Sequence, residues 1–161
     1  MGTGNSGRYF GTFGSHVFPG SKDYMKPGDP FSQSIKNRKD KDVDGFYDVV
    51  AHGTTGTILV EHNGKQINID HRTLAKLLAN NKESNGKPIR LFSCNTGKVD
   101  SGFAQNLANK LNIPVKAPTE YVWARPNGSY FIAGAMTIDD KIYPDFSQPG
   151  KFKTYYPKRR H

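Results

Sequence analysis

Two short apolar runs, each ending on a chemically reactive residue, constrain the fold of this chain most. Residues 46–51 run Phe-Tyr-Asp-Val-Val-Ala and end at His52 and Gly53, and residues 88–93 run Pro-Ile-Arg-Leu-Phe-Ser and end at Cys94. Apolar runs of this length predict short buried strands. In open α/β sheets, ligands bind at the carboxyl ends of the parallel strands. If the two strands are neighbours, an imidazole and a thiol lie side by side at that edge.

The rest of the chain alternates predicted strands and helices. Asn63-Gly64 is a strong signal for a two-residue hairpin turn, and leucines at helical spacing predict the helices. This alternation is typical of an α/β protein with parallel central strands. In chain order, the predicted elements are a strand over 46–51, a hairpin over 57–69, a helix over 71–82, a strand over 89–93, a helix carrying Phe103, Leu107 and Leu111, a strand over 113–116 and a hairpin over 121–133.

The length of 161 residues favours one domain. We expect an irregular arm rich in Gly, Pro and Ser over residues 1–44, a catalytic domain over residues 45–146 and a basic tail over residues 147–161. No run approaches the roughly 18 apolar residues of a membrane span, so no span is expected. The segment also shows no signal peptide.

The composition and motifs exclude several kinds of site. A single cysteine excludes an internal disulfide. The Cys, His and carboxylate residues lack the spacing of zinc ligands, so no metal is expected, and the glycine-rich nucleotide-binding motifs are absent. The net charge of +9 favours nucleic acid, anionic phosphates or an acidic protein as a partner.

Cys94 is the candidate nucleophile, although a lone cysteine is more often a buried core residue. A free thiol has a pKa of about 8.5, and a protonated imidazole or a helix N-terminus lowers it. We expect both near Cys94, from His52 on the adjacent strand and from the helix that follows. Gly53 lets a substrate carbonyl approach the backbone, so the N–H groups of Gly53 and Cys94 are candidate oxyanion donors.

These segments resemble a known family. Val49-Val50-Ala51-His52-Gly53, a hairpin, a helix and then Ile89-Arg90-Leu91-Phe92-Ser93-Cys94 match the pattern of caspase-like (clan CD) cysteine peptidases. Their bacterial relatives include the autoprocessing domains of large secreted toxins. The resemblance covers about residues 45–118. The stretch from residue 91 to 119 also resembles the C-terminal domains of polymorphic toxins, which Rhs-type or filamentous-haemagglutinin-type carriers deliver.

The resemblance implies a caspase-like three-layer α/β sandwich with a central, mostly parallel sheet and β-hairpin additions. It implies that His52 is the general base or acid, Cys94 the nucleophile and Gly53 an oxyanion donor. It also implies substrate contacts from the third strand and the loop after it, although the aromatic residues suit the core equally well. The implied contacts are Thr119, Tyr121 and Trp123.

Two details of the implied site stay open at this point. Asn95 either lines the pocket or only bonds the turn. An acidic third residue is not evident, because strand alternation puts Asp48 on the face of His52 without ensuring contact. Autoprocessing relatives bind inositol hexakisphosphate, so an inositol phosphate activator suits the basic charge, although no residue matches a defined phosphate site.

The expected function is a cysteine-nucleophile hydrolase, a caspase-like peptidase acting as a bacterial toxin effector or as a self-releasing toxin module. Its partners would be a protein or peptide substrate and an immunity protein. It would be secreted as part of a larger bacterial protein and act in a target cell. Three alternatives stay open. One uses the same Cys/His pair for deamidation, acyl transfer or lipid hydrolysis, another is a basic nuclease toxin that uses His52 or His71 on nucleic acid, and the last is a binding module with an inactive site.

Overall fold

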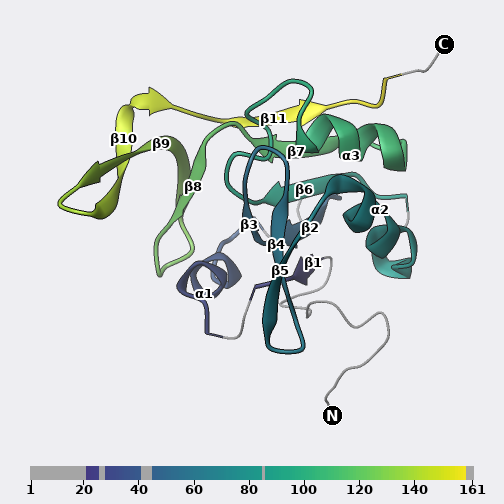
Figure 1. The fold of residues 1–161 in the computed structure, drawn as a ribbon, viewed down its shortest axis with the longest axis horizontal. Coiled ribbons are helices and arrows are strands. Elements are labelled where there is room, and N and C mark those ends of the chain that lie inside the picture. Colours follow the sequence, from purple (N-terminus) through teal and green to yellow (C-terminus); the bar gives the residue numbers. More distant parts are fainter. Residues whose placement is uncertain (1–20, 26–27, 41–44, 85, 159–161) are drawn as a thin grey trace.

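A five-stranded sheet lies at the centre of the fold (Figure 1). The computed structural model describes residues 21–25, 28–40, 45–84 and 86–158. In sheet order, the strands are β1 (Ser21–Asp23), β2 (Tyr47–Val50), β6 (Ile89–Phe92), β7 (Val115–Pro118) and β11 (Phe152–Tyr155). The first four strands are parallel, and β11 joins the edge antiparallel to β7. The predicted α/β class with a partly parallel sheet is therefore confirmed.

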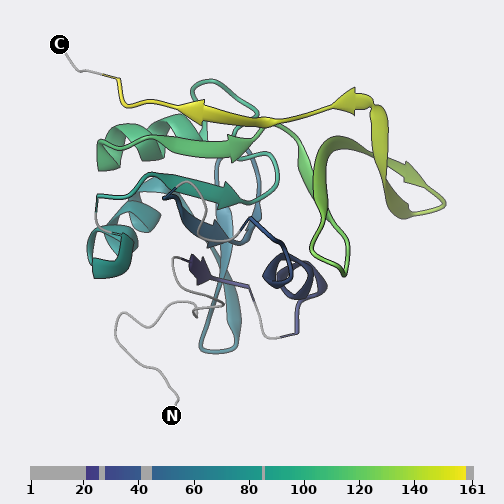
Figure 2. The same cartoon turned by 180° about the vertical axis from the view of Figure 1, so that it is seen from behind.

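Helices cover both faces of this sheet. The helices of the described residues are α1 (Pro30–Lys36), α2 (His71–Ala79), α3 (Phe103–Leu111) and a 3₁₀ turn at Lys82–Ser84. Val49 packs with leucines of α2 and α3, whereas the next residue, Val50, packs with Ile35 of α1. Successive residues of a strand point to opposite faces, so α2 and α3 lie together on one face and α1 lies on the other (Figures 1 and 2).

Two smaller antiparallel sheets extend the central one. The first consists of β3 (His52–Gly53), β4 (Ile58–His62) and β5 (Lys65–Ile69), and the second of β8 (Tyr121–Ala124), β9 (Tyr130–Ile138) and β10 (Lys141–Pro149). Asn63 and Gly64 have φ values of 52° and 79°. Both lie in the left-handed region that the predicted two-residue turn requires, so this hairpin is confirmed.

The expected irregularity of residues 1–44 does not hold for two segments. Residues 21–23 form β1, and residues 30–36 form α1. The helix is short and buries only Ser32 and Ile35, so its apolar pattern is too brief to be seen in the sequence. Residues 1–20 of the expected arm lie outside the described residues.

The expected basic tail also contains a strand. Residues 152–155 form β11 beside β7, and the hydroxyl of the buried Tyr155 donates a 2.6 Å hydrogen bond to the carbonyl of Gly97. Phe152 packs with the core cluster on the α1 side of the sheet and Tyr155 with the cluster on the α2 and α3 side, so the strand contributes one aromatic side chain to each face. The lysines of the segment concealed this strand in the sequence. None of the helices in the described residues is long and apolar enough to span a membrane.

Candidate functional site

His52 and Cys94 follow neighbouring parallel strands. β2 and β6 pair with Val50 opposite Phe92, and the N–H of Ala51 extends the pairing with a 3.3 Å hydrogen bond to the carbonyl of Phe92. His52 and Cys94 each follow that matched pair by two residues. Both residues lie just beyond the ends of β2 and β6, at the carboxyl edge of the parallel strands. The strand pairing therefore puts the two segments at one edge of the sheet, as predicted for neighbouring strands.

Gly53 brings the two segments into direct contact. A methyl group in place of its hydrogen would lie 2.9 Å from the carbonyl oxygen of Cys94, from Cβ of Ser93 and from Cγ2 of Thr96. Real side chains do not approach so closely, and Ser93 and Thr96 are fully buried. The absence of a side chain at Gly53 therefore allows the backbone after His52 to pack directly on the loop that carries the thiol.

A carboxylate that the sequence analysis did not identify holds the imidazole. Nε2 of His52 lies 2.7 Å from Oδ2 of Asp29. Asp29 is the N-cap of α1, and its Oδ1 accepts hydrogen bonds from the N–H groups of Phe31 (2.9 Å) and Ser32 (3.4 Å). Asp29 is 7% exposed, whereas the His52 side chain is 46% exposed. The helix cap thus fixes one side of an imidazole that is otherwise open to solvent.

The environment of Asp29 keeps it ionised at neutral pH. Burial by itself raises its pKa, but the hydrogen bond and the charge of His52, together with the N–H groups of Phe31 and Ser32, outweigh burial, so the pKa lies below its ordinary value. The sequence did hold a signal for the cap, because Asp29-Pro30 is typical of a helix start. It held none for the contact with His52, which depends on how α1 docks on the sheet.

The thiol of Cys94 is partly buried beneath β8. The N–H of Val122 lies 3.4 Å from its sulfur. Burial raises the pKa of Cys94, and the N–H groups of Val122 and of Cys94 itself only reduce that effect. The expectation of a lowered thiol pKa is therefore wrong, because burial outweighs the other influences and α3 begins only at Phe103. The resting group is a neutral thiol with two N–H groups directed at its sulfur.

Two polar atoms beside the thiol lack a hydrogen-bond partner among the described residues. They are Oγ of Ser93, which is fully buried, and Oδ1 of Asn95. Asn95 has a φ of 64°, and its N–H donates a 3.0 Å hydrogen bond to the carbonyl of Glu120. Most buried polar atoms are hydrogen-bonded. Oδ1 of Asn95 is thus a buried acceptor with unused hydrogen-bonding capacity next to Cys94 in the chain.

The other predicted substrate contacts have bonds within the fold. Thr119 joins the chain to Lys151, because its Oγ1 accepts from the N–H of Lys151 (3.0 Å) and its own N–H donates to the Lys151 carbonyl (2.9 Å). The indole N–H of Trp123 donates to the carbonyl of Ala133 (3.0 Å) inside the β8–β9 hairpin. Tyr121 lies beside Trp123, with ring centroids 6.0 Å apart. These contacts give Thr119 and Trp123 a role within the fold, their contact with substrate stays a prediction, and β8 reaches the thiol through its backbone.

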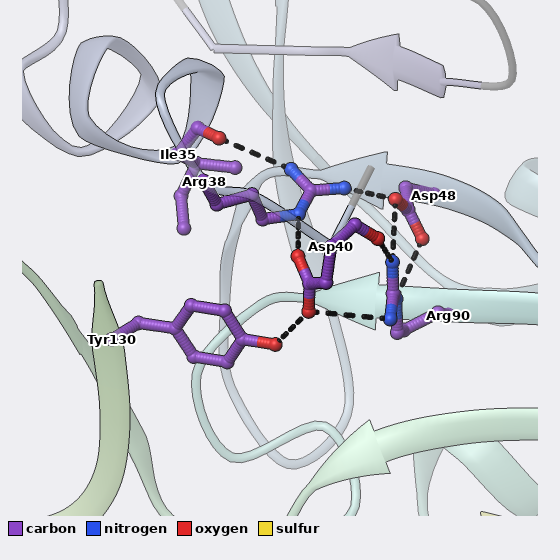
Figure 3. Close-up of polar contacts among 6 residues, drawn as sticks. All are labelled: Ile35, Arg38, Asp40, Asp48, Arg90 and Tyr130. Carbon is purple, nitrogen blue, oxygen red and sulfur yellow. Dashed lines mark hydrogen bonds and ion pairs between the residues drawn. The ribbon is translucent and has the colours of Figure 1, made fainter. Parts of the chain in front are cut away.

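A buried charged cluster lies on the face of the sheet that carries α1 (Figure 3). Asp48 accepts hydrogen bonds from Arg90 at 2.7 and 2.9 Å and pairs with Arg38. Asp40 pairs with Arg38 (2.8 Å) and with Arg90 (3.5 Å), and it accepts a hydrogen bond from the hydroxyl of Tyr130. The side chains of Arg38 and Asp48 are fully buried. Asp48 thus belongs to an ionic cluster and is not the acidic partner of His52.

This cluster ties together the elements that carry the site. Asp48 and Arg90 precede His52 and Cys94 by four residues on β2 and β6, and Arg38 also donates to the carbonyl of Ile35 in α1 (3.2 Å). Removing one partner of a buried ion pair leaves an uncompensated charge and typically costs about 3–5 kcal/mol. The cluster therefore holds α1 and the two strands in one arrangement.

The described residues contain no group of three His, Cys, Asp or Glu side chains that is arranged to hold a metal ion. His71, the other histidine of the nuclease alternative, begins α2, and burial lowers its pKa.

A family model for a domain of unknown function (DUF8616) matches residues 20–132. This match spans more than half of the chain, so the protein belongs to that family. The comparisons with curated proteins and with solved structures found no match.

Proposed function

We propose that the protein is a cysteine-nucleophile hydrolase in which Cys94 attacks, His52 moves the proton and Asp29 orients His52. The observation that carries this proposal is the 2.7 Å contact between His52 and Asp29, at the sheet edge where Cys94 follows the neighbouring strand β6. A nucleophile, a base and a group that orients the base form the arrangement that activated nucleophiles share. Asp29 engages Nε2, which leaves Nδ1 of His52 for the proton transfer.

The proposed reaction begins from a neutral thiol, because burial raises the pKa of Cys94. The sulfur forms a bond to the carbonyl carbon of the substrate while His52 takes the thiol proton. The intermediate then expels its leaving group, which receives that proton from the imidazolium, and an acyl-thioester stays on Cys94. Water, deprotonated by His52, breaks the thioester and restores the thiol. The ionised Asp29 stabilises the imidazolium in both steps.

Backbone N–H groups beside the sulfur suit the negative charge that develops on the substrate oxygen. Those of Val122 and Cys94 both face the thiol, and the N–H of Gly53 is a third candidate donor. In known enzymes, removing one such donor costs about 3 kcal/mol of transition-state stabilisation. We therefore assign the oxyanion site to the space between β8 and the loop after β6.

We further propose a caspase-like sandwich and a peptide-bond substrate. The order of the elements supports this, because a His-Gly strand end, a hairpin, a helix and a Cys strand end follow one another, and helices lie on both faces of the sheet. In this proposal the protein is a toxin effector or a self-releasing module of a larger secreted protein, and an immunity protein is its partner. Deamidation, acyl transfer and lipid hydrolysis use the same pair of residues and differ in product.

The test compares the wild-type protein with Cys94→Ala and Asp29→Asn. Each is incubated with a mixed peptide library and with a lysate, and the products are identified by mass spectrometry. We expect cleaved peptide bonds with the wild type, none with Cys94→Ala and a reduced rate with Asp29→Asn. Asp70→Asn, which alters the cap of α2 instead, is the matched control and should keep full activity. Cleavage that persists in Cys94→Ala would refute the proposal, and RNA or DNA degradation that persists there would favour a nuclease.

A further inference from the structure

A second buried carboxylate lies at the sheet edge that carries the candidate site. Asp23 is the last residue of β1 and pairs in register with Val50 of β2, and His52 follows Val50 by two residues. Asp23 is 6% exposed. Aspartate is almost never buried to this extent unless its carboxylate has partners. The proposed reaction gives Asp23 no role, so its partners show what it can do.

Asp23 accepts hydrogen bonds from two neighbouring segments. The hydroxyl of Ser32 in α1 donates to its Oδ2, and the N–H of Met25 donates to its Oδ1 (2.9 Å). Burial and the nearby charge of Asp29 raise the pKa of Asp23, and these hydrogen bonds and Lys36 only reduce that effect. A buried acceptor that loses its donor bears the full cost of desolvation. The bond to Ser32 is therefore one that the buried carboxylate needs.

Ser32 connects this carboxylate to the one that holds the imidazole. Its hydroxyl donates to Asp23, and its N–H donates to Oδ1 of Asp29 (3.4 Å). Ser32 is itself 5% exposed. One buried serine thus contacts both carboxylates, Asp23 with its side chain and Asp29 with its backbone.

These contacts close a ring that begins and ends at His52. The imidazole contacts Asp29, and the first turn of α1 leads from Asp29 to Ser32. The Ser32 hydroxyl contacts Asp23, and the pairing of β1 with β2 leads back to the strand that precedes His52. A single hydrogen bond would let the first turn of α1 pivot on the sheet. The second contact, at Asp23, removes that freedom.

The composition of α1 makes this second contact important. The helix has seven residues, and its only buried residues are Ser32 and Ile35. Apolar packing of one isoleucine does not fix the rotation of a helix, so the buried hydroxyl has to contribute to it. A displacement of about 1 Å at a catalytic group can reduce a rate by about a hundredfold. Small shifts of this turn therefore matter for the contact between Asp29 and His52.

We propose that Asp23 is a positioning residue that, through the hydroxyl of Ser32, fixes Asp29 against the imidazole of His52. This role rests on the proposed function, in which Asp29 orients His52. The hydrogen bond does the positioning, and the charge of Asp23 is not required for it. Asparagine has the same shape as aspartate and can also bond to a hydroxyl, so it should replace Asp23 better than alanine does.

The first test measures kcat and KM on a peptide that the wild type cleaves. We expect Ser32→Ala to lower kcat at least about tenfold and to leave KM unchanged, because the orienting group acts on the base and not on substrate binding. Asp23→Ala should lose as much, and Asp23→Asn should recover most of that loss. The matched control is Ser34→Ala on the same helix, which should keep the wild-type kcat. Circular dichroism verifies that each variant is folded.

The second test does not require catalysis. Urea unfolding is measured for Ser32→Ala, for His52→Ala and for the double variant. Independent sites change the unfolding equilibrium constant additively on a logarithmic scale, to within about twofold. We expect His52→Ala to change that constant by clearly less in the Ser32→Ala background than in the wild type, because the ring is already open. Ser34→Ala combined with His52→Ala should be additive.

Each result decides the proposal. Wild-type kcat in folded Ser32→Ala would overturn it, as would additive effects of Ser32→Ala and His52→Ala. Equal effects of Ser34→Ala, or an Asp23→Asn variant no better than Asp23→Ala, would also overturn it. If Ser32→Ala does not fold, Asp23→Ala takes its place in both tests. A wild type that cleaves no peptide would refute the proposed function, and the urea measurements would then decide the positioning role alone.

Discussion

Replacing Gly53 with alanine tests the contact that joins the histidine and cysteine segments. The added methyl group would lie 2.9 Å from three atoms, one of them the backbone carbonyl oxygen of Cys94. Ordinary contacts lie at about 3.5–4.0 Å, so the two segments must separate by roughly 0.6–1 Å. Ser93 and Thr96, which supply the other two atoms, are fully buried and have little room to move. Overpacking of this kind costs about 1–3 kcal/mol of the free energy of unfolding.

Gly56 offers a matched control in the loop that follows β3. A methyl group added there meets nothing within 4 Å. Alanine at a compatible position reduces the entropy of the unfolded chain and stabilises a protein by about 0.4–1 kcal/mol. Urea unfolding of both variants should therefore show a lower midpoint for Gly53→Ala and an unchanged or higher midpoint for Gly56→Ala. Equal stability of the two variants would refute the argument that the contact at Gly53 is tight.

The same pair of variants reports on the proposed catalytic site. A displacement of about 1 Å at reacting groups can reduce a rate by about a hundredfold. We expect Gly53→Ala to lose most of the hydrolase activity at temperatures where it is still folded, and Gly56→Ala to keep it. Full activity of folded Gly53→Ala would mean that the spacing of the two segments does not matter for the reaction.

Three further predictions concern single polar groups. Tyr130→Phe removes the hydrogen bond to the Asp40 carboxylate and should lower the free energy of unfolding by about 1–3 kcal/mol, and an unchanged urea midpoint would contradict it. The folded-state pKa of Asp29 is lowered, so its contribution is complete above its unfolded pKa of about 3.9 and disappears as the pH falls through the folded value. The stability difference between wild type and Asp29→Asn should therefore shrink below about pH 4, and a difference that persists in stronger acid would oppose this. Because burial raises the pKa of Cys94, iodoacetamide should label the wild type slowly at neutral pH and faster above the ordinary thiol pKa of about 8.5. Fast labelling that is independent of pH around neutrality would indicate a thiolate instead.

Local patterns predicted the elements that surround the site. The leucine spacing of α2, the Asn63-Gly64 turn and the two apolar runs depend on residues close together in the sequence, and each formed the expected element. The pairing of β2 with β6 was only a condition of the sequence analysis, and the structure supplies it. Given that pairing, the positions of His52 and Cys94 after the two strands put them at one edge of the sheet.

The features that the sequence analysis missed depend on tertiary packing. The contact of Asp29 with His52 arises only when α1 docks on the sheet, and the sequence gives no measure of that docking. The pKa of Cys94 depends on burial beneath β8, a strand that follows it by more than twenty residues. Asp48 had the right position along its strand to serve His52, but two arginines from other elements pair with it instead.

The two ends of α1 connect the buried charged cluster to the candidate site. The helix has seven residues and buries few apolar side chains, so apolar packing alone holds it weakly. Its first end is fixed by the Asp29–His52 contact, and its last end by Arg38, which joins the carbonyl of Ile35 to Asp48. Loss of either polar anchor frees α1 to shift on the sheet, and a shift of α1 moves Asp29 away from the imidazole. Variants of Arg38 should therefore weaken the contact between Asp29 and the imidazole of His52. Arg38 itself is fully buried within the cluster and is not part of the proposed reaction.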